Sequence, residues 1–241
     1  MPHLFVNRPR LHDLADPESA AGAQFRWETA NAVLYKIGGL TFIVGSVLFF
    51  PAVATRTDLG AWVFLGGSLL YLVVTGHDLV EAVRYRRRHA GRPTVRGRLE
   101  PVAAISYVAG TLLFTVGSAF FLSSIGLTAA GAWCFTIGSL LFILGATVNV
   151  LEIVTAEDLI TLQLMNLTAL CFVTGSLLFT VASIPYLWQP DDPLDRRVLD
   201  DFLAAQFLAG SVLFWLGGVF SYRRARRVFR AHRGGDPAAP R

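Results

Sequence analysis

Apolar and polar residues follow one another in long blocks along the chain rather than at short intervals. Six apolar stretches are separated by short polar segments, and each is about 20 residues long, the length that an α-helix needs to cross a bilayer. Strands of a membrane β-barrel would be shorter and would alternate in polarity. The pattern predicts an all-α, polytopic membrane protein with six transmembrane helices, at about residues 32–53, 60–80, 102–125, 131–153, 159–187 and 202–220.

Each apolar stretch contains one copy of a five-residue motif, Gly-Ser-x-x-aromatic. Small side chains let membrane helices approach closely, and a serine can form hydrogen bonds across such a contact. Because neighbouring helices run in opposite directions, the spacing predicts that all six motifs lie at one depth in the membrane. Helix packing is the expected role, and a permeation path lined by serines is the alternative. The residues concerned are Gly45, Ser46, Gly67, Ser68, Gly117, Ser118, Gly138, Ser139, Gly175, Ser176, Gly210 and Ser211.

The six helices are expected to pair into three repeated hairpins. Ala61-Trp62-Val63-Phe64 precedes the second motif at the offset at which Ala132-Trp133-Cys134-Phe135 precedes the fourth. The last hairpin keeps the motif but has diverged around it. Repeats of this size indicate tandem supersecondary units. The hairpin repeats are assigned to residues 30–83, 101–154 and, for the divergent one, 155–222.

Positive charge is concentrated on one side of the predicted membrane. That side receives an N-terminal segment (1–29, partly interfacial), an Arg-rich connection (84–100) and a basic tail (223–241). Asp16-Pro17-Glu18 is typical of a helix start; a disordered tail up to about Gln24 is the alternative. Because arginine and lysine accumulate on the cytoplasmic side, both termini are predicted to be cytoplasmic.

The net charge of +4 comes from arginines that flank the apolar stretches. Such arginines usually contact anionic lipid headgroups at the cytoplasmic face. No basic surface with interleaved aromatic residues is present, which excludes nucleic acid as a partner. The predicted headgroup contacts are Arg84, Arg86, Arg87, Arg88, Arg223, Arg224, Arg226 and Arg227.

Ionisable residues occur near the cytoplasmic ends of the second and fourth helices. His77, Asp78 and Glu81 lie within about one helical turn, and Asn149 and Glu152 occupy the offsets of Asp78 and Glu81 in the next repeat. Charges at membrane depth are often functional. Salt bridges to the Arg-rich connection are the first interpretation, and a proton or cation pathway is the second. A metal site is disfavoured because only one histidine is available, so we expect neither metal nor cofactor.

No enzymatic constellation is recognisable in the chain. There is no nucleophile with a base, no phosphate-binding glycine loop and no haem-type histidine pair. We therefore expect a protein that is not an enzyme.

The motif pattern, with Trp62-Val63-Phe64 before Gly67-Ser68 and Trp133-Cys134-Phe135 before Gly138-Ser139, resembles the YrhK-like domain of bacterial membrane proteins. The resemblance implies membrane hairpins in a bacterial inner membrane and no established activity. A non-enzymatic membrane scaffold or accessory subunit is the predicted function, with a second copy or another membrane protein as partner. The alternative is a small transporter or channel that uses the acidic residues and Asn149 at its inner mouth.

Overall fold

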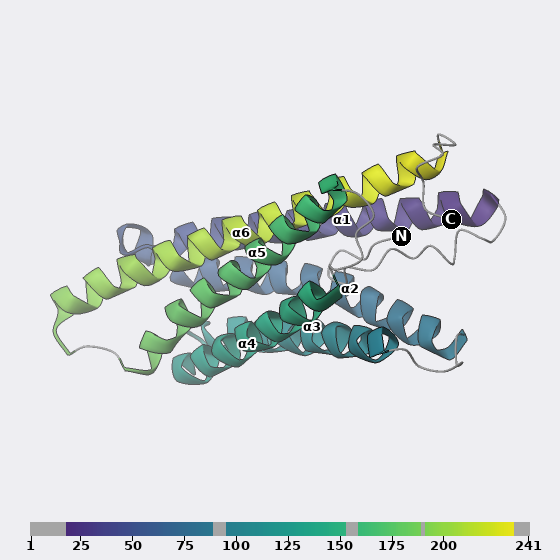
Figure 1. Cartoon of the computed structure of the whole chain (residues 1–241). Helices are drawn as coiled ribbons and strands as arrows, with labels where there is room; N and C mark the ends of the chain where they lie inside the picture. Colours follow the sequence, from purple (N-terminus) through teal and green to yellow (C-terminus); the bar gives the residue numbers. More distant parts are fainter. Residues whose placement is uncertain (1–17, 89–94, 153–158, 189–190, 234–241) are drawn as a thin grey trace.

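The computed structural model describes residues 18–88, 95–152, 159–188 and 191–233 (Figure 1). Over these ranges the chain is helical and contains no strand, which confirms the predicted class. Each of the six long helices holds a segment that is long and apolar enough to cross a membrane. They are α1 (Glu18–Leu48), α2 (Thr57–Arg88), α3 (Val95–Phe120), α4 (Thr128–Glu152), α5 (Leu159–Ser183) and α6 (Pro193–Arg233), with short 3-10 helices η2 (Pro51–Arg56) and η4 (Ile184–Leu187).

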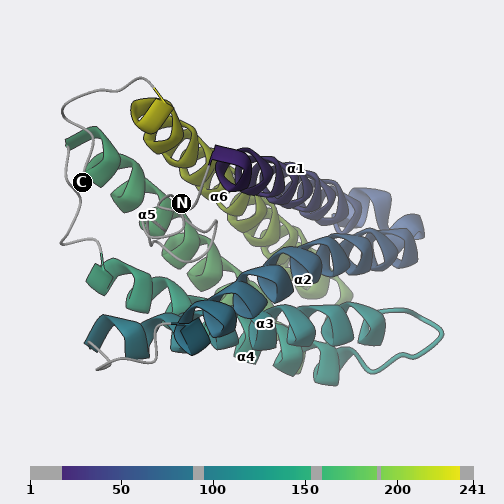
Figure 2. The same ribbon diagram turned by 90° about the vertical axis from the view of Figure 1, so that its right-hand side faces the viewer.

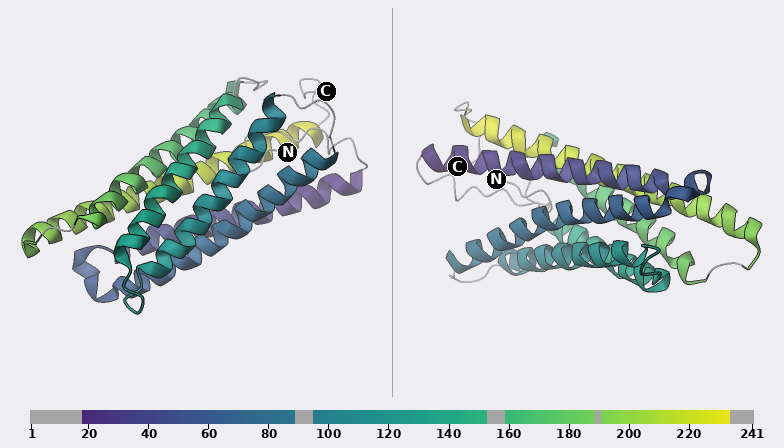
Figure 3. Two further views of the ribbon diagram at one scale, coloured as in Figure 1. Left: turned by 90° about the horizontal axis from the view of Figure 1, so that it is seen from below. Right: turned by 180° about the vertical axis from the view of Figure 1, so that it is seen from behind.

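The six helices form a closed ring. Each long helix packs against its neighbours in the chain, and α6 also packs against α1. Figure 2 and Figure 3 show the helices as successive antiparallel hairpins around a common interior. Because the number of helices is even, α1 begins and α6 ends at the same end of the bundle (Figure 1). We call this the terminal end, and the other the opposite end.

α1, α2 and α6 are longer than the apolar stretches that predicted them. α1 is continuous from Glu18 to Leu48, so residues 18–29 of the N-terminal segment belong to the same helix as the first predicted span. Asp16 and Pro17, the predicted cap, lie outside the described residues. α2 and α6 continue into their arginine-rich ends because arginine is a good helix former and no proline or glycine interrupts them there. α5 ends at Ser183, two residues before Pro185 of η4, because proline lacks the N–H that would continue the helix.

The outer surface of the ring is apolar. Large apolar side chains on every long helix are exposed, and Trp62 and Trp133, at matching positions of the first two hairpins, are more than half exposed. A surface of this kind is stable against lipid tails and would aggregate in water. The exterior therefore agrees with a multi-pass membrane protein. One exposed residue on each helix is Val44, Leu69, Leu112, Leu140, Leu177 and Val212.

All twelve residues of the Gly-Ser motifs are buried between helices, as the packing role requires. They do not lie at one depth, however. A Cβ atom on Gly67 would lie 3.2 Å from the carbonyl oxygen of Gly38, whereas one on Gly45 would lie 3.3 Å from that of Gly60. The prediction of a common depth is therefore wrong.

The motifs occupy two levels because α1 and α3 each carry two small positions seven residues apart. Gly110 faces Gly138 as Gly38 faces Gly67, and in the third hairpin Gly175 faces Gly210. Gly117 lies two turns nearer the opposite end, as Gly45 does. α5 carries one motif, and Ala182 and Ser183, seven residues beyond its glycine and serine, are both fully buried.

Serines of two motifs meet where the ring closes. The hydroxyl of Ser46 donates to the carbonyl oxygen of Phe42 (2.7 Å) and lies 3.2 Å from the hydroxyl of Ser211. Ser211 in turn donates to the carbonyl oxygen of Phe207 (2.7 Å). The pair joins α1 to α6 across 165 residues of sequence.

Cysteines at these two positions are expected to form a disulfide. With Cys134 and Cys171 replaced by alanine, Ser46→Cys combined with Ser211→Cys should cross-link under a membrane-permeant oxidant, because the side-chain separation suits the bond. The measurement is a change in gel mobility that a reductant reverses. Ser46→Cys with Val212→Cys is the control, since Val212 faces outward. Equal cross-linking of the two pairs would contradict the closed ring.

Candidate functional site

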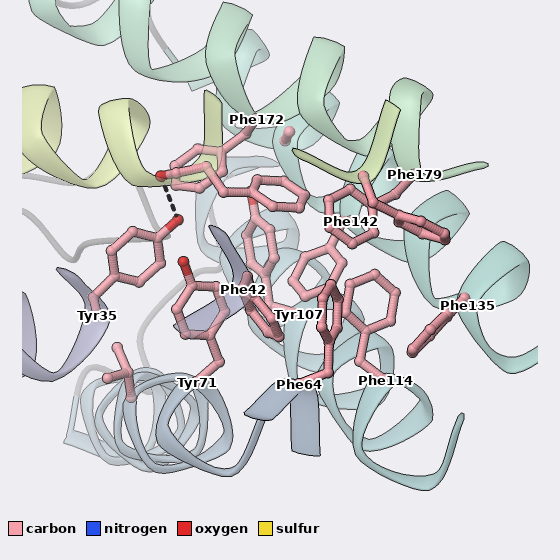
Figure 4. Close-up of a cluster of buried hydrophobic side chains, with 14 of the residues drawn as sticks. Tyr35, Phe42, Phe64, Tyr71, Tyr107, Phe114, Phe135, Phe142, Phe172 and Phe179 are labelled. Carbon is pink, nitrogen blue, oxygen red and sulfur yellow. Dashed lines mark hydrogen bonds between the residues drawn. The ribbon is translucent and has the colours of Figure 1, made fainter. Parts of the chain in front are cut away.

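Aromatic side chains from all three hairpins fill the interior of the ring. Phe64 and Phe179 are fully buried, and their ring centroids lie 6.3 Å apart. Phe114 stacks on Phe179 at 5.6 Å, and Phe207 meets it edge-on at 5.1 Å. Figure 4 shows the rings of Phe64, Phe114 and Phe179 within this group of packed aromatic side chains. The centre of the bundle is therefore an apolar plug.

A layer of tyrosines bounds this plug toward the terminal end. Tyr35 and Tyr71 stack with centroids 4.5 Å apart, and the Tyr35 hydroxyl donates to the carbonyl oxygen of Phe214 at 3.0 Å (Figure 4). Tyr107 is buried beside them. The sequence reasoning overlooked this layer, although a signal exists. Aromatic residues recur every seven residues in α1 and in α3, starting at Tyr35 and Tyr107.

The predicted polar cluster lies two turns beyond Tyr71 toward the terminal end. One ligand-capable atom from each of His77, Asp78 and Glu81 lies within 4.8 Å of the others. Asp78 is only 3% exposed, whereas His77 and Glu81 are half-buried. The structure thus brings together the three α2 residues that the sequence singled out.

Asn31 of α1 is a member of this site that sequence reasoning missed. It is 5% exposed, and its side-chain nitrogen lies 3.0 Å from Nδ1 of His77. The available signal was a polar amide within an apolar stretch, four residues before Tyr35. The contact links the first two helices at the level of the cluster.

Arg224 corrects the prediction for the lipid-facing arginines. It was grouped with the headgroup contacts, but it is 2% exposed, as is expected of an inward-facing position. Arg224 follows Gly210 by 14 residues, as Glu81 follows Gly67, so it occupies the position of Glu81 in the third hairpin. Helical periodicity turns it inward beside Ser221, which is also buried. Of the other predicted headgroup residues, four have exposed side chains: Arg87, Arg223, Arg226 and Arg227.

Several predicted residues cannot be placed by their side chains. Asn149 lies in α4 and Glu152 is the last residue of that helix. Their side chains, and those of Arg84, Arg86 and Arg88, lie outside the described set. The contribution of Asn149 and Glu152 of α4 to the polar cluster therefore stays a prediction.

The family model described as YrhK-like protein matches the chain twice, over residues 25–83 and 97–153. These ranges correspond to the α1–α2 and α3–α4 hairpins, and the α5–α6 hairpin lies outside both. No curated protein and no solved structure matches the chain. The resemblance carried by the paired Trp and Gly-Ser positions is confirmed: the protein is a multi-pass membrane protein with two YrhK-like domains in tandem.

Proposed function

We propose that the protein is a non-enzymatic scaffold or accessory subunit of a bacterial inner membrane, packed through its Gly-Ser contacts. The observation that supports this proposal is the aromatic plug. The rings of Phe64, Phe114, Phe179 and Phe207 come from all three hairpins and lie about as close as aromatic rings pack in protein cores. A solute would have to displace them to cross the bundle. A scaffold needs no open path through the membrane, so closely packed rings are compatible with that role.

Both termini are proposed to be cytoplasmic, because four of the six exposed arginines that the structure describes in α2 and α6 lie toward the terminal end, whereas Arg196 and Arg197 lie toward the opposite end. Cysteines introduced at Ala20 and Ala231, in a chain without Cys134 and Cys171, test this orientation. A membrane-impermeant maleimide should label both only after the cells are lysed. Labelling of either one in intact spheroplasts would overturn the orientation.

A scaffold or accessory subunit should hold a partner on one part of its lipid-facing surface. Photo-crosslinking residues placed singly at Leu69, Leu112, Leu140, Leu177 and Val212 sample all helices except α1. In native membranes we expect discrete protein adducts, either a second copy or another membrane protein, from adjacent positions only. Lipid adducts alone at every position would contradict the proposal.

A transporter is the second candidate, because Asp78 and Arg224 place charge inside the ring at the terminal end. Buried charge of this kind often marks an ion pathway.

Reconstituted protein tests the choice between the two candidates. We expect flux of protons, sodium and potassium through wild-type proteoliposomes to equal that through empty liposomes, because the plug closes the bundle. Asp78→Asn and Glu81→Gln should then leave the rate unchanged. Wild-type flux above background that falls in either variant would replace the scaffold proposal with transport.

A further inference from the structure

We propose that His77, Asp78 and Glu81 bind one divalent transition-metal ion of the zinc type, with Asn31 positioning the histidine ring. This inference is independent of the scaffold proposal, since a metal site could stabilise a bundle of any function. The sequence disfavoured metal because a second histidine is missing. In the structure, however, the three side chains lie close enough together for one ion, and Asn31 contacts the histidine ring.

The spacing of the three residues suits a single ion. His77 and Glu81 are one turn apart on α2, and Asp78 precedes Glu81 by three residues, so all three project from adjacent positions on one helix. Their donor atoms lie within 4.8 Å of one another. Ligands of tetrahedral zinc are separated by about 3.4 Å, so side-chain movement of about 1–1.5 Å completes the geometry. Three protein ligands and a water are a common zinc set.

Asn31 supplies evidence from a second helix. A metal-binding histidine usually makes a hydrogen bond through its other ring nitrogen, which fixes the ring and its tautomer. The Asn31 side chain contacts Nδ1 of His77 at 3.0 Å. In the structure the amide nitrogen faces Nδ1 and donates to it. Exchanging the amide nitrogen and oxygen, which have nearly the same shape, makes the oxygen accept the Nδ1 proton and leaves Nε2 with the lone pair that a metal needs. A buried asparagine is therefore placed where such an orienting residue belongs.

Burial and charge favour an ion with two positive charges. Asp78 is 97% buried, and a buried carboxylate is stable only among charge or hydrogen-bond partners, of which a metal ion can be one. Two of the three proposed ligands are carboxylates, which suit a divalent cation. An imidazole together with carboxylates suits zinc, manganese or iron better than calcium or magnesium.

Zinc binding to the purified full-length protein tests the inference. The protein is prepared in detergent with an affinity tag that contains no histidine, stripped with a chelator and dialysed against zinc chloride. We expect one saturable equivalent of zinc by elemental analysis. The affinity should fall at least about 10-fold in His77→Gln and in Asp78→Asn, and about 10–100-fold in Asn31→Ala. Asp195→Asn, an exposed carboxylate near the opposite end, is the matched control and should bind as the wild type does.

Thermal unfolding separates a metal site from a structural ion pair. Zinc should raise the Tm of the wild type and of Asp195→Asn but not that of His77→Gln, because a ligand stabilises only the state that it binds. If Asp78→Asn fails to fold, the nearly isosteric His77→Gln and the second-helix variant Asn31→Ala decide the question. Equal zinc binding by wild type and His77→Gln, or no binding by the wild type, would overturn the proposal.

Discussion

Replacing Phe179 with alanine is expected to destabilise the bundle by about 3–5 kcal/mol, because it leaves a cavity that the surrounding rings cannot fill. Phe179 is fully buried. Its ring contacts Phe114 of the second hairpin at 5.6 Å, and Phe207 and Phe214 of α6 at 5.1 and 5.2 Å. No lipid tail reaches this position, so the lost contacts stay unreplaced. The loss should therefore weaken the docking of all three hairpins at once.

Unfolding by SDS in mixed micelles, followed by tryptophan fluorescence, measures this effect. Phe202→Ala is the matched control, since Phe202 lies on α6 and is half exposed. Lipid or detergent can occupy the space that its ring leaves, so we expect a change of less than about 1 kcal/mol there. Similar losses for the two variants would show that the aromatic interior does not hold the hairpins together.

Replacing Gly110 with alanine is expected to cost about 1–3 kcal/mol, although it adds only one methyl group. The added Cβ would lie 2.9 Å from the carbonyl oxygen of Gly138 and 3.4 Å from the ring of Phe142. The carbonyl oxygen of Gly138 belongs to the backbone, so it cannot move away through a change of side-chain rotamer. α3 and α4 must therefore move apart along the whole contact.

Gly66→Ala provides the control for this prediction. A Cβ on Gly66 would have no neighbour within 4 Å, because this residue of α2 is exposed. Alanine favours the helix over glycine, so the variant should be as stable as the wild type or up to about 1 kcal/mol more stable. The same SDS titration compares the two. Loss of stability in Gly66→Ala, or none in Gly110→Ala, would contradict close backbone packing at the motifs.

The sequence by itself determined the number of spans, their pairing into hairpins and the burial of the Gly-Ser motifs. The physical reason is that backbone groups in hydrocarbon must be hydrogen-bonded within each helix, so length and apolarity alone identify the spans. Recurrent small residues in otherwise bulky helices then indicate contact. His77, Asp78 and Glu81 were also found from the sequence, because they lie within one turn of the same helix.

Only the tertiary structure decided which parts of different helices meet. The depth of the motifs depends on which glycine faces which, and α1 offers both Gly38 and Gly45 to α2. Arg224 was assigned to lipid headgroups because composition does not distinguish the inward from the outward side of an arginine-rich helix. Asn31 joined the polar cluster through a contact across 46 residues of chain. Closure of α6 onto α1 and the filling of the interior by aromatic rings likewise depend on packing between distant segments, which no local pattern encodes.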